Sequence, residues 1–281
     1  MNNGIKLRII KNSIFKILVI LVSFILVIPL FLIFFYIFKM GISSINIDFL
    51  INLPKPVGET GGGVSNAIIG TFMLIILSSI VSVPLGIAAG VFLSENRSSK
   101  LAGITSSCIE IIQGVPSIVI GIIAYVWVVK PMGSFTALSG SIALAIIMLP
   151  VIVKSTEETL ILIPHSLKEA ALSLGVPYYK VIIRVILPSG LSGILTGILL
   201  SLARISGETA PLLFTAFGNP FMNLNLLKPV NSLPLLIFNY AASPYPEWHS
   251  IAWGASFVLI ALVLVLNLTA KGIARKWKVQ F

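Results

Sequence analysis

Six long apolar runs constrain the fold of this chain more than any other feature of its sequence. They cover residues 17–38, 68–93, 106–129, 136–160, 187–210 and 251–270. Each is long enough to cross the hydrocarbon core of a bilayer, where only helices or a closed barrel satisfy the backbone hydrogen bonds. The runs do not alternate as barrel strands do. We therefore predict an all-α, polytopic membrane protein with about six transmembrane helices.

The sparse charges of the chain indicate its orientation. Charged residues make up 10% of the sequence, against roughly 25% in soluble domains. The net charge of +10 comes from Lys and Arg between the apolar runs, which is typical of a topology signal rather than of a nucleic-acid interface. With the N-terminus inside, inner segments hold fourteen of these residues and outer segments four. We expect both termini to be cytoplasmic and no nucleic-acid partner.

A single membrane domain accounts for most of the chain. We expect a cytoplasmic segment at 1–16, a first transmembrane helix at 17–38 with an outer loop at 40–67, a main membrane domain at 65–270 that includes a cytoplasmic loop at 164–188, and a basic cytoplasmic tail at 271–281. His165 and His249 lack Cys or carboxylate partners at ligand spacing, so we expect no metal site.

Two charged residues interrupt the apolar stretch LARISGETAPLLFTAFG at 202–218. Arg204 and Glu208 are four residues apart, so on a helix they share one face and partly neutralise each other. Gly207 and Pro211 weaken the helix there, which a membrane tolerates only beside protein or water. We predict a polar cavity in which the Arg204 guanidinium donates to phosphate-like oxygens. The alternative is a structural ion pair that joins two helices.

The inner loop between the fourth and fifth runs predicts two short helices. PHSLKEAALSLG is rich in helix formers and ends at Gly175, a residue that favours the left-handed conformation after a helix. VPYYKVIIRVILP then resumes a helix after Pro177. Ala170 and Ala171 are small enough for another surface to approach, and Glu169 offers a carboxylate beside them. An ordinary amphipathic helix at the membrane surface is the alternative.

The same loop resembles the signature of ABC importer permeases: Glu-Ala-Ala, three residues, Gly, nine residues, then Ile-x-Leu-Pro. Val185 replaces the Ile, and the remaining positions match at fixed spacing. In that family the segment forms the coupling helix that docks on the ATP-hydrolysing subunit. The resemblance implies that the ATPase-coupling residues are Glu169, Ala170, Ala171, Gly175, Leu187 and Pro188.

Three further stretches are similar to the phosphate permeases of that family. They are GVPSIVIGI at 114–122, STEETLILIPHSLKEAALSLG at 155–175 and ARISGETAPLLFTA at 203–216. The resemblance identifies residues 65–270 as an ABC transmembrane type-1 (MetI-like) permease domain, closer to the A-type than to the C-type of the two related chains. It implies a substrate path along Arg204, Glu208 and Lys154. The resemblance leads us to expect Arg at the position of Lys154 in many relatives. Lys keeps the charge but lacks the planar fork of Arg, which counts against a bidentate role there.

The function implied by the resemblance is a permease subunit of an ATP-driven phosphate importer in a bacterial or archaeal plasma (inner) membrane. Its implied partners are a second homologous phosphate permease, a dimer of ATP-binding subunits, an extracytoplasmic phosphate-binding protein, inorganic phosphate and membrane lipid. The sequence has no Gly-x-x-x-x-Gly-Lys-Ser/Thr loop. We therefore expect no enzyme activity and no cofactor on this chain, with ATP and Mg on the partner ATPase.

Three other functions compete with this interpretation. A permease for sulfate or molybdate shares the coupling motif and differs only at 202–218. An ion-coupled secondary transporter is expected to show internal repeats and midplane carboxylates, and the sequence shows neither. A structural membrane protein without a transport path does not require Arg204 inside the membrane.

Overall fold

The computed structural model describes residues 3–59 and 61–276 of the chain. Residues 1–2 of the predicted N-terminal segment and 277–281 of the predicted tail lie outside this description. Within the described ranges the regular structure is helical, apart from an isolated β-bridge between Phe217 and Val230. The all-α prediction is therefore confirmed.

The chain also contains one 3-10 turn (η1) and two π-helical turns (η2 and η3), and its longest connections are at 52–64 and 214–232. In chain order the helices and turns are α1 (Asn3–Gly41), η1 (Ile42–Ser44), α2 (Ile47–Ile51), α3 (Ser65–Glu95), α4 (Lys100–Gly114), α5 (Ser117–Ala124), η2 (Tyr125–Val129), α6 (Lys130–Met132), α7 (Ala137–Ile161), α8 (His165–Ser173), α9 (Tyr178–Val181), η3 (Ile182–Ile186), α10 (Leu187–Ser189), α11 (Leu191–Ser206), α12 (Ala210–Leu213), α13 (Leu233–Ala241) and α14 (Pro246–Lys276).

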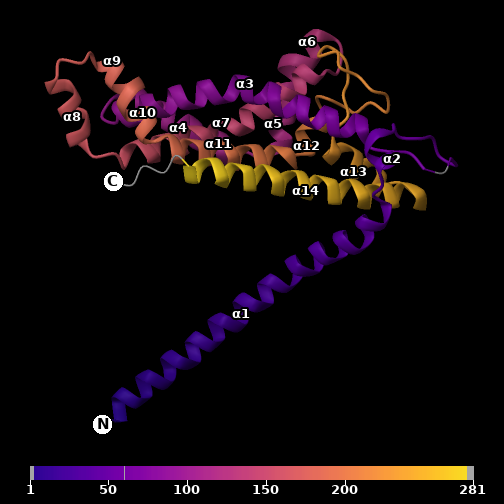
Figure 1. The fold of residues 1–281 in the computed structure, drawn as a ribbon, viewed down its shortest axis with the longest axis horizontal. Helices are drawn as coiled ribbons and strands as arrows, with labels where there is room; N and C mark the ends of the chain where they lie inside the picture. Colours follow the sequence, from indigo (N-terminus) through magenta and orange to yellow (C-terminus); the bar gives the residue numbers. More distant parts are fainter. Residues whose placement is uncertain (1–2, 60, 277–281) are drawn as a thin grey trace.

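Four of these helices, α1, α3, α7 and α14, are individually long and apolar enough to cross a membrane. Two bent pairs qualify as well when each is taken as one span, which gives up to six crossings among the described residues. This agrees with the six apolar runs. Figure 1 shows the main helices lying side by side, while α1 diverges from them.

The predicted third span at 106–129 is not one straight helix. It consists of α4 and the α5–α6 segment, which are bent by 106°. The break falls at Val115, which is extended (φ −73°, ψ 132°) because the residue before a proline disfavours the helical region. Pro116 then precedes the first turn of α5. The predicted span at 106–129 agrees with the structure when the bent pair is taken as one span, and its break lies at Val115 and Pro116.

The predicted fifth span at 187–210 also differs from the structure. The α9–α10 segment meets α11 at an angle of 69°. At its other end α11 stops at Ser206, and the chain resumes a short helix only at Ala210. A weak point at Gly207 is thus confirmed, but the helix ends there rather than bending.

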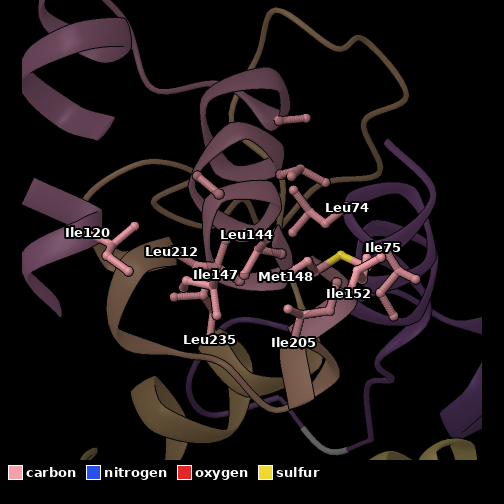
Figure 2. Close-up of a cluster of buried hydrophobic side chains, with 13 residues drawn as sticks. Leu74, Ile75, Ile120, Leu144, Ile147, Met148, Ile152, Ile205, Leu212 and Leu235 are labelled. Atoms are coloured by element: carbon pink, nitrogen blue, oxygen red, sulfur yellow. The ribbon is translucent and has the colours of Figure 1, made fainter. Parts of the chain in front are cut away.

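Helices α3 and α7 form the centre of the bundle. A cluster of buried apolar side chains joins them to α5, α11, α12 and α13, as Figure 2 shows for Leu74, Met148, Ile152 and Ile205. Small residues bring the two central helices together: a Cβ at Gly86 would lie 2.6 Å from Ile152 Cγ2. The two helices are therefore closely packed along their inner halves.

The helix that carries Arg204 packs against α7 through glycines. A Cβ at Gly193 would lie 2.3 Å from Thr159 Oγ1, and one at Gly197 would lie 2.1 Å from Ser155 Oγ. Ser155 also donates a hydrogen bond of 3.2 Å to the Gly193 carbonyl. This close approach holds α11 at a fixed position beside α7.

Replacing Gly197 with alanine is expected to lower the stability of the folded chain by about 1–3 kcal/mol, because the added methyl group must separate α7 from α11. Gly103→Ala in α4 is the matched control, since a Cβ there meets nothing within 4 Å. That control is expected to be neutral or stabilising. Thermal unfolding in detergent measures both. Equal melting temperatures for the two variants would contradict the close packing of α7 and α11.

Helix α1 touches the rest of the chain mainly through its C-terminal part. Tyr36 lies 6.1 Å from Trp253 and Phe38 lies 5.7 Å from Phe257, ring centre to ring centre, on α14. In Figure 1, α8, α9 and α10 lie at one end of the bundle together with the end of α14, whereas α2, α6 and α13 lie at the other. The loop at 164–188, for which a coupling role is predicted, and the long loop at 214–232 are thus at opposite ends.

The loop at 214–232 satisfies the backbone at the start of α7. The N–H groups of Thr136, Ala137 and Leu138 donate to carbonyls of this loop at 3.0–3.1 Å. The first N–H groups of a helix have no backbone carbonyl within it, so the loop takes the place of water there, and the Thr136 N–H also donates to Ser139 Oγ at 3.2 Å. This end of the bundle is therefore built by segments far apart in the sequence.

Candidate functional site

The direction of Arg204 is set by its neighbours on α11. Ser201 and Ile205 are buried, and Ile205 belongs to the central apolar cluster. Successive helical residues are about 100° apart around the axis, so burial of Ile205 turns Arg204 outward. Thr196, Leu200 and Arg204 then form an exposed row at four-residue spacing. Core packing, rather than the charge itself, fixes this orientation.

Arg204 also occupies the last turn of a helix that ends early. α11 has 16 residues, which is about 24 Å at about 1.5 Å per residue, shorter than the roughly 30 Å hydrocarbon core. Beyond Arg204, the N–H of Gly207 donates to the Arg204 carbonyl at 3.2 Å, and the N–H of Glu208 donates to the Ile205 carbonyl at 3.2 Å. A positive side chain near a helix C-terminus is favourable. The end of α11 at Ser206 therefore places backbone polar groups and the Arg204 side chain close together.

Arg204 and Glu208 form the ion pair that their spacing predicts, but a loose one. Arg204 Nε lies 3.6 Å from Glu208 Oε1, and the side chains are 43% and 16% exposed on this chain. Within residues 3–59 and 61–276, Arg204 has no second ion pair or side-chain hydrogen bond. Its guanidinium carries five N–H donors. Most of them therefore remain available to an oxyanion.

Lys154 does not join this pair. Its Nζ donates to Ser106 Oγ at 2.8 Å and to Glu110 Oε1 at 3.2 Å on α4, and lies 3.3 Å from Glu157 Oε2 on its own helix. Ser106 also donates to Glu110 at 3.1 Å. The network links α4 to α7. Glu157 follows Lys154 by three residues on the same helix, whereas Glu110 is 44 residues away and no local spacing connects it to Lys154. A role for Lys154 in a substrate path stays a prediction.

The residues predicted to couple to an ATPase divide into an exposed and a packed group. Glu169 and Ala170 are exposed on α8. Ala171 and Leu187 instead pack on an apolar cluster formed by Leu160, Val181, Ile182, Ile186 and Ile194. Pro188 is exposed. We expected both alanines to admit another surface, but only Ala170 faces outward, because Ala171 holds α8 to the bundle.

Gly175 makes the bend between the two short helices. Its φ is +75°, in the left-handed region that glycine adopts readily, and a Cβ there would meet nothing within 4 Å. Its N–H donates to the Leu172 carbonyl at 2.9 Å. The predicted helix end at Gly175 is confirmed. The requirement for glycine comes from this backbone angle rather than from crowding.

The bend presents an apolar tip on the surface of the chain. Leu174 is 83% exposed, and Leu172, Tyr178 and Tyr179 are exposed beside it. Sequence reasoning missed this tip, and it also missed the contacts of Lys168 on α8 with Glu95 at the end of α3. Lys168 and Glu95 are 73 residues apart, so no local spacing connects them.

No group of three or more His, Cys, Asp or Glu residues suited to a metal ion occurs in residues 3–59 and 61–276. Cys108 is free and exposed.

Comparisons with known proteins agree with this architecture. Residues 82–279 match the family described as binding-protein-dependent transport system inner membrane component. A solved structure of a bacterial alginate ABC transporter has a TM-score of 0.71 at 15% identity and covers 96% of each chain, which shows a shared fold.

Two curated relatives are similar over most of their length. The phosphate transport system permease protein PstA of Xylella fastidiosa (strain 9a5c) is 43% identical over 241 residues, 85% of this chain and 84% of that protein. The probable phosphate transport system permease protein PstA of Methanocaldococcus jannaschii is 37% identical over 261 residues, 92% of each. The chain therefore belongs to the binding-protein-dependent transport system inner membrane components, and among them to the family of PstA phosphate transport permeases.

Proposed function

We propose that this chain is the transmembrane permease subunit of an ATP-driven importer of inorganic phosphate and forms half of the translocation path. As a permease of this family it is a multi-pass plasma membrane protein that works with an ATPase and a substrate-binding protein. The observation that carries the proposal is the outward-facing guanidinium of Arg204 at the broken end of α11. The similarity to PstA proteins supports phosphate as its ligand.

The exposed position of Arg204 supports a path completed by another chain. A charge facing lipid hydrocarbon costs at least about 2.5 kcal/mol, and the single loose contact with Glu208 offsets only part of that cost. A polar cavity between this chain and a second homologous permease avoids this cost, because Arg204 then faces water and protein instead of lipid. There Arg204 meets phosphate with planar paired donors, and Glu208 orients it or releases it when the anion arrives. The structural ion pair remains the competing explanation.

The exposed part of the coupling loop supports docking of an ATPase dimer. Glu169, Ala170, Leu172 and Leu174 form a projecting surface with apolar and acidic groups. The chain itself lacks a phosphate-binding loop for ATP. In this proposal ATP and Mg bind to the separate ATPase subunits, and their closure moves α8 and opens the path outward.

The orientation of the chain follows from the distribution of Lys and Arg. The loop that carries α8 lies inside, as do both termini, and the loop at 214–232 faces the extracytoplasmic phosphate-binding protein. Figure 1 supports this arrangement, since α8 and the end of α14 lie at the same end of the bundle. Lys154 lies in α7 toward the inner side. We keep it as a candidate residue of the inner part of the path.

Uptake of labelled phosphate and labelled sulfate tests the proposal. In cells that lack only this chain, phosphate uptake is expected to fall to background and to return with the restored gene, while sulfate uptake is unchanged. Loss of the partner ATPase is expected to have the same effect on phosphate. A response of sulfate instead, or of neither anion, would overturn the assignment to phosphate and leave only an importer permease of this fold.

A further inference from the structure

A cluster of three polar side chains joins the coupling helix to the inner end of α3. Lys168 Nζ on α8 donates to Glu95 Oε2, and the Tyr178 hydroxyl at the start of α9 donates to the same oxygen. Lys168 also donates to the Tyr178 hydroxyl at 3.2 Å and lies 4.8 Å from the centre of that ring. We call these residues the Glu95 cluster. It brings three helices together at one carboxylate.

Glu95 occupies a position that is unfavourable without these partners. It is the last residue of α3, where the helix dipole disfavours a negative charge, and its side chain is only 13% exposed. Burial alone would lower the pKa of Lys168, but the hydrogen bond to Glu95 and its charge outweigh burial and raise that pKa. Lys168 is therefore charged at neutral pH and neutralises Glu95.

A cavity separates much of α8 from the end of α3. It has a volume of about 560 Å³ and is lined by Ser94, Glu95 and Arg97 on one side and by His165 and Lys168 on the other. The apolar contact between the two helices is indirect, because Ala171 of α8 and Val91 of α3 both pack on the cluster around Val181 and Ile182. The Glu95 cluster is therefore a direct polar link between α8 and the end of α3.

Close packing connects α3 to the helix that carries Arg204. Gly86 and Gly90 pack α3 closely against Ile152 and Thr156 of α7. On an adjacent face, α7 packs against Gly193 and Gly197 of α11. Closely packed helices of this kind move together rather than deform.

We propose that Glu95, Lys168 and Tyr178 are positioning residues that transmit movement of the coupling helix α8 to α3, and through α7 to the Arg204 region. This inference rests on the proposed function, because it assigns a role within ATP-driven phosphate import. It assigns none of the three residues to phosphate or ATP binding. Their effect is on the amount of phosphate moved for each ATP hydrolysed.

The test uses the complete transport complex in proteoliposomes, with phosphate uptake and ATP hydrolysis measured together. Lys168→Met and Glu95→Gln are each expected to lower the phosphate moved per ATP by about tenfold, the effect of losing one charge-assisted hydrogen bond. Tyr178→Phe is expected to lower the phosphate moved per ATP by less than either of these changes. Lys180→Met is the matched control, because Lys180 lies in the same loop over the Tyr179 ring and outside the cluster.

Two variants separate a positioning role from general damage to the fold. Lys168→Arg keeps the charge and is expected to retain most of the coupling. The double variant Glu95→Lys with Lys168→Glu is expected to recover much of the phosphate-to-ATP ratio that either single change loses. It restores opposite charges and places the positive one at the end of α3. An unchanged phosphate-to-ATP ratio in Lys168→Met and Glu95→Gln would overturn the proposal. So would loss of ATPase binding in Lys168→Met, which would make Lys168 a docking residue.

A distance measurement keeps this inference separable from the proposed function. Spin labels at Ser98→Cys and Ser166→Cys, with exposed Cys108 replaced by serine, report the separation of α3 from α8 in the same complex. The distance is expected to widen or spread in Lys168→Met and to stay unchanged in Lys180→Met. If the unaltered complex moves no phosphate, the proposed function fails, and the label-to-label distance alone then tests whether the Glu95 cluster positions α8. An identical distance in Lys168→Met and Lys180→Met would refute that positioning role.

Discussion

Replacing Arg204 with alanine is expected to lower phosphate uptake by about 100-fold, while the chain still reaches the membrane and assembles with its partners. A bidentate pair of charge-assisted hydrogen bonds contributes about 1.5 kcal/mol or more for each bond, which corresponds to about 100-fold for the pair. Little packing is lost with the side chain, because Arg204 is 43% exposed and has only the loose contact with Glu208. Labelled-phosphate uptake, scaled to the amount of assembled complex, measures the effect.

Two companion variants sharpen this result. Arg204→Lys keeps the charge and loses the planar fork, so uptake is expected to lie between the alanine variant and the unaltered protein. Arg184→Ala removes an exposed arginine from η3 outside the proposed path and serves as the matched control. Failure of Arg204→Ala to assemble would instead favour the structural ion pair with Glu208. Normal uptake in a fully assembled variant would remove Arg204 from the path.

Replacing Gly175 with proline is expected to reduce phosphate uptake to background and to uncouple ATP hydrolysis from transport. Proline fixes φ near about −65°, whereas Gly175 has a φ of +75°. The change also removes the N–H that bonds to the Leu172 carbonyl at 2.9 Å. The bend between α8 and α9 therefore cannot form, and the exposed tip at Leu174 is displaced. Phosphate uptake and ATP hydrolysis in the reconstituted complex measure the effect.

Controls for this variant come from the same residue and from the outer loop. Gly175→Ala keeps the bend at a cost of about 1–2 kcal/mol and is expected to reduce uptake only modestly. Gly58→Pro changes another exposed glycine of positive φ with no neighbour within 4 Å, and is expected to leave coupling intact. Glu169→Lys, which reverses the charge on the exposed face of α8, is expected to uncouple as Gly175→Pro does. Wild-type coupling of ATP hydrolysis to transport in both Gly175→Pro and Glu169→Lys would remove the docking role of this segment.

The prolines show where sequence reasoning about the fold stops. Pro84 and Pro150 lie inside α3 and α7, and neither helix ends there. Pro116 occupies a similar apolar run and yet separates α4 from α5 by a bend of 106°. Packed membrane helices tolerate a proline when neighbours satisfy the freed backbone groups. Whether they do so depends on tertiary neighbours that the local sequence does not specify.

The sequence by itself determined the properties that depend on composition and short spacing. Apolar length predicts the membrane class and the number of crossings, because hydrocarbon thickness sets the length of a spanning helix. The spacing of Arg204 and Glu208 predicts their ion pair, and the position of Gly175 predicts the end of α8. The ion pair and the helix end arise within one or two helical turns, where neighbours in sequence are neighbours in space.

Only the tertiary structure decided which distant side chains meet and which way each one faces. Burial of Ile205 turns Arg204 outward, and Ala171 packs inward while its neighbour Ala170 is exposed. Lys154 pairs with Glu110 across 44 residues and Lys168 with Glu95 across 73. The relative rotation and position of packed helices set these contacts, and those depend on the fit of many side chains at once. No spacing within a single segment contains that information.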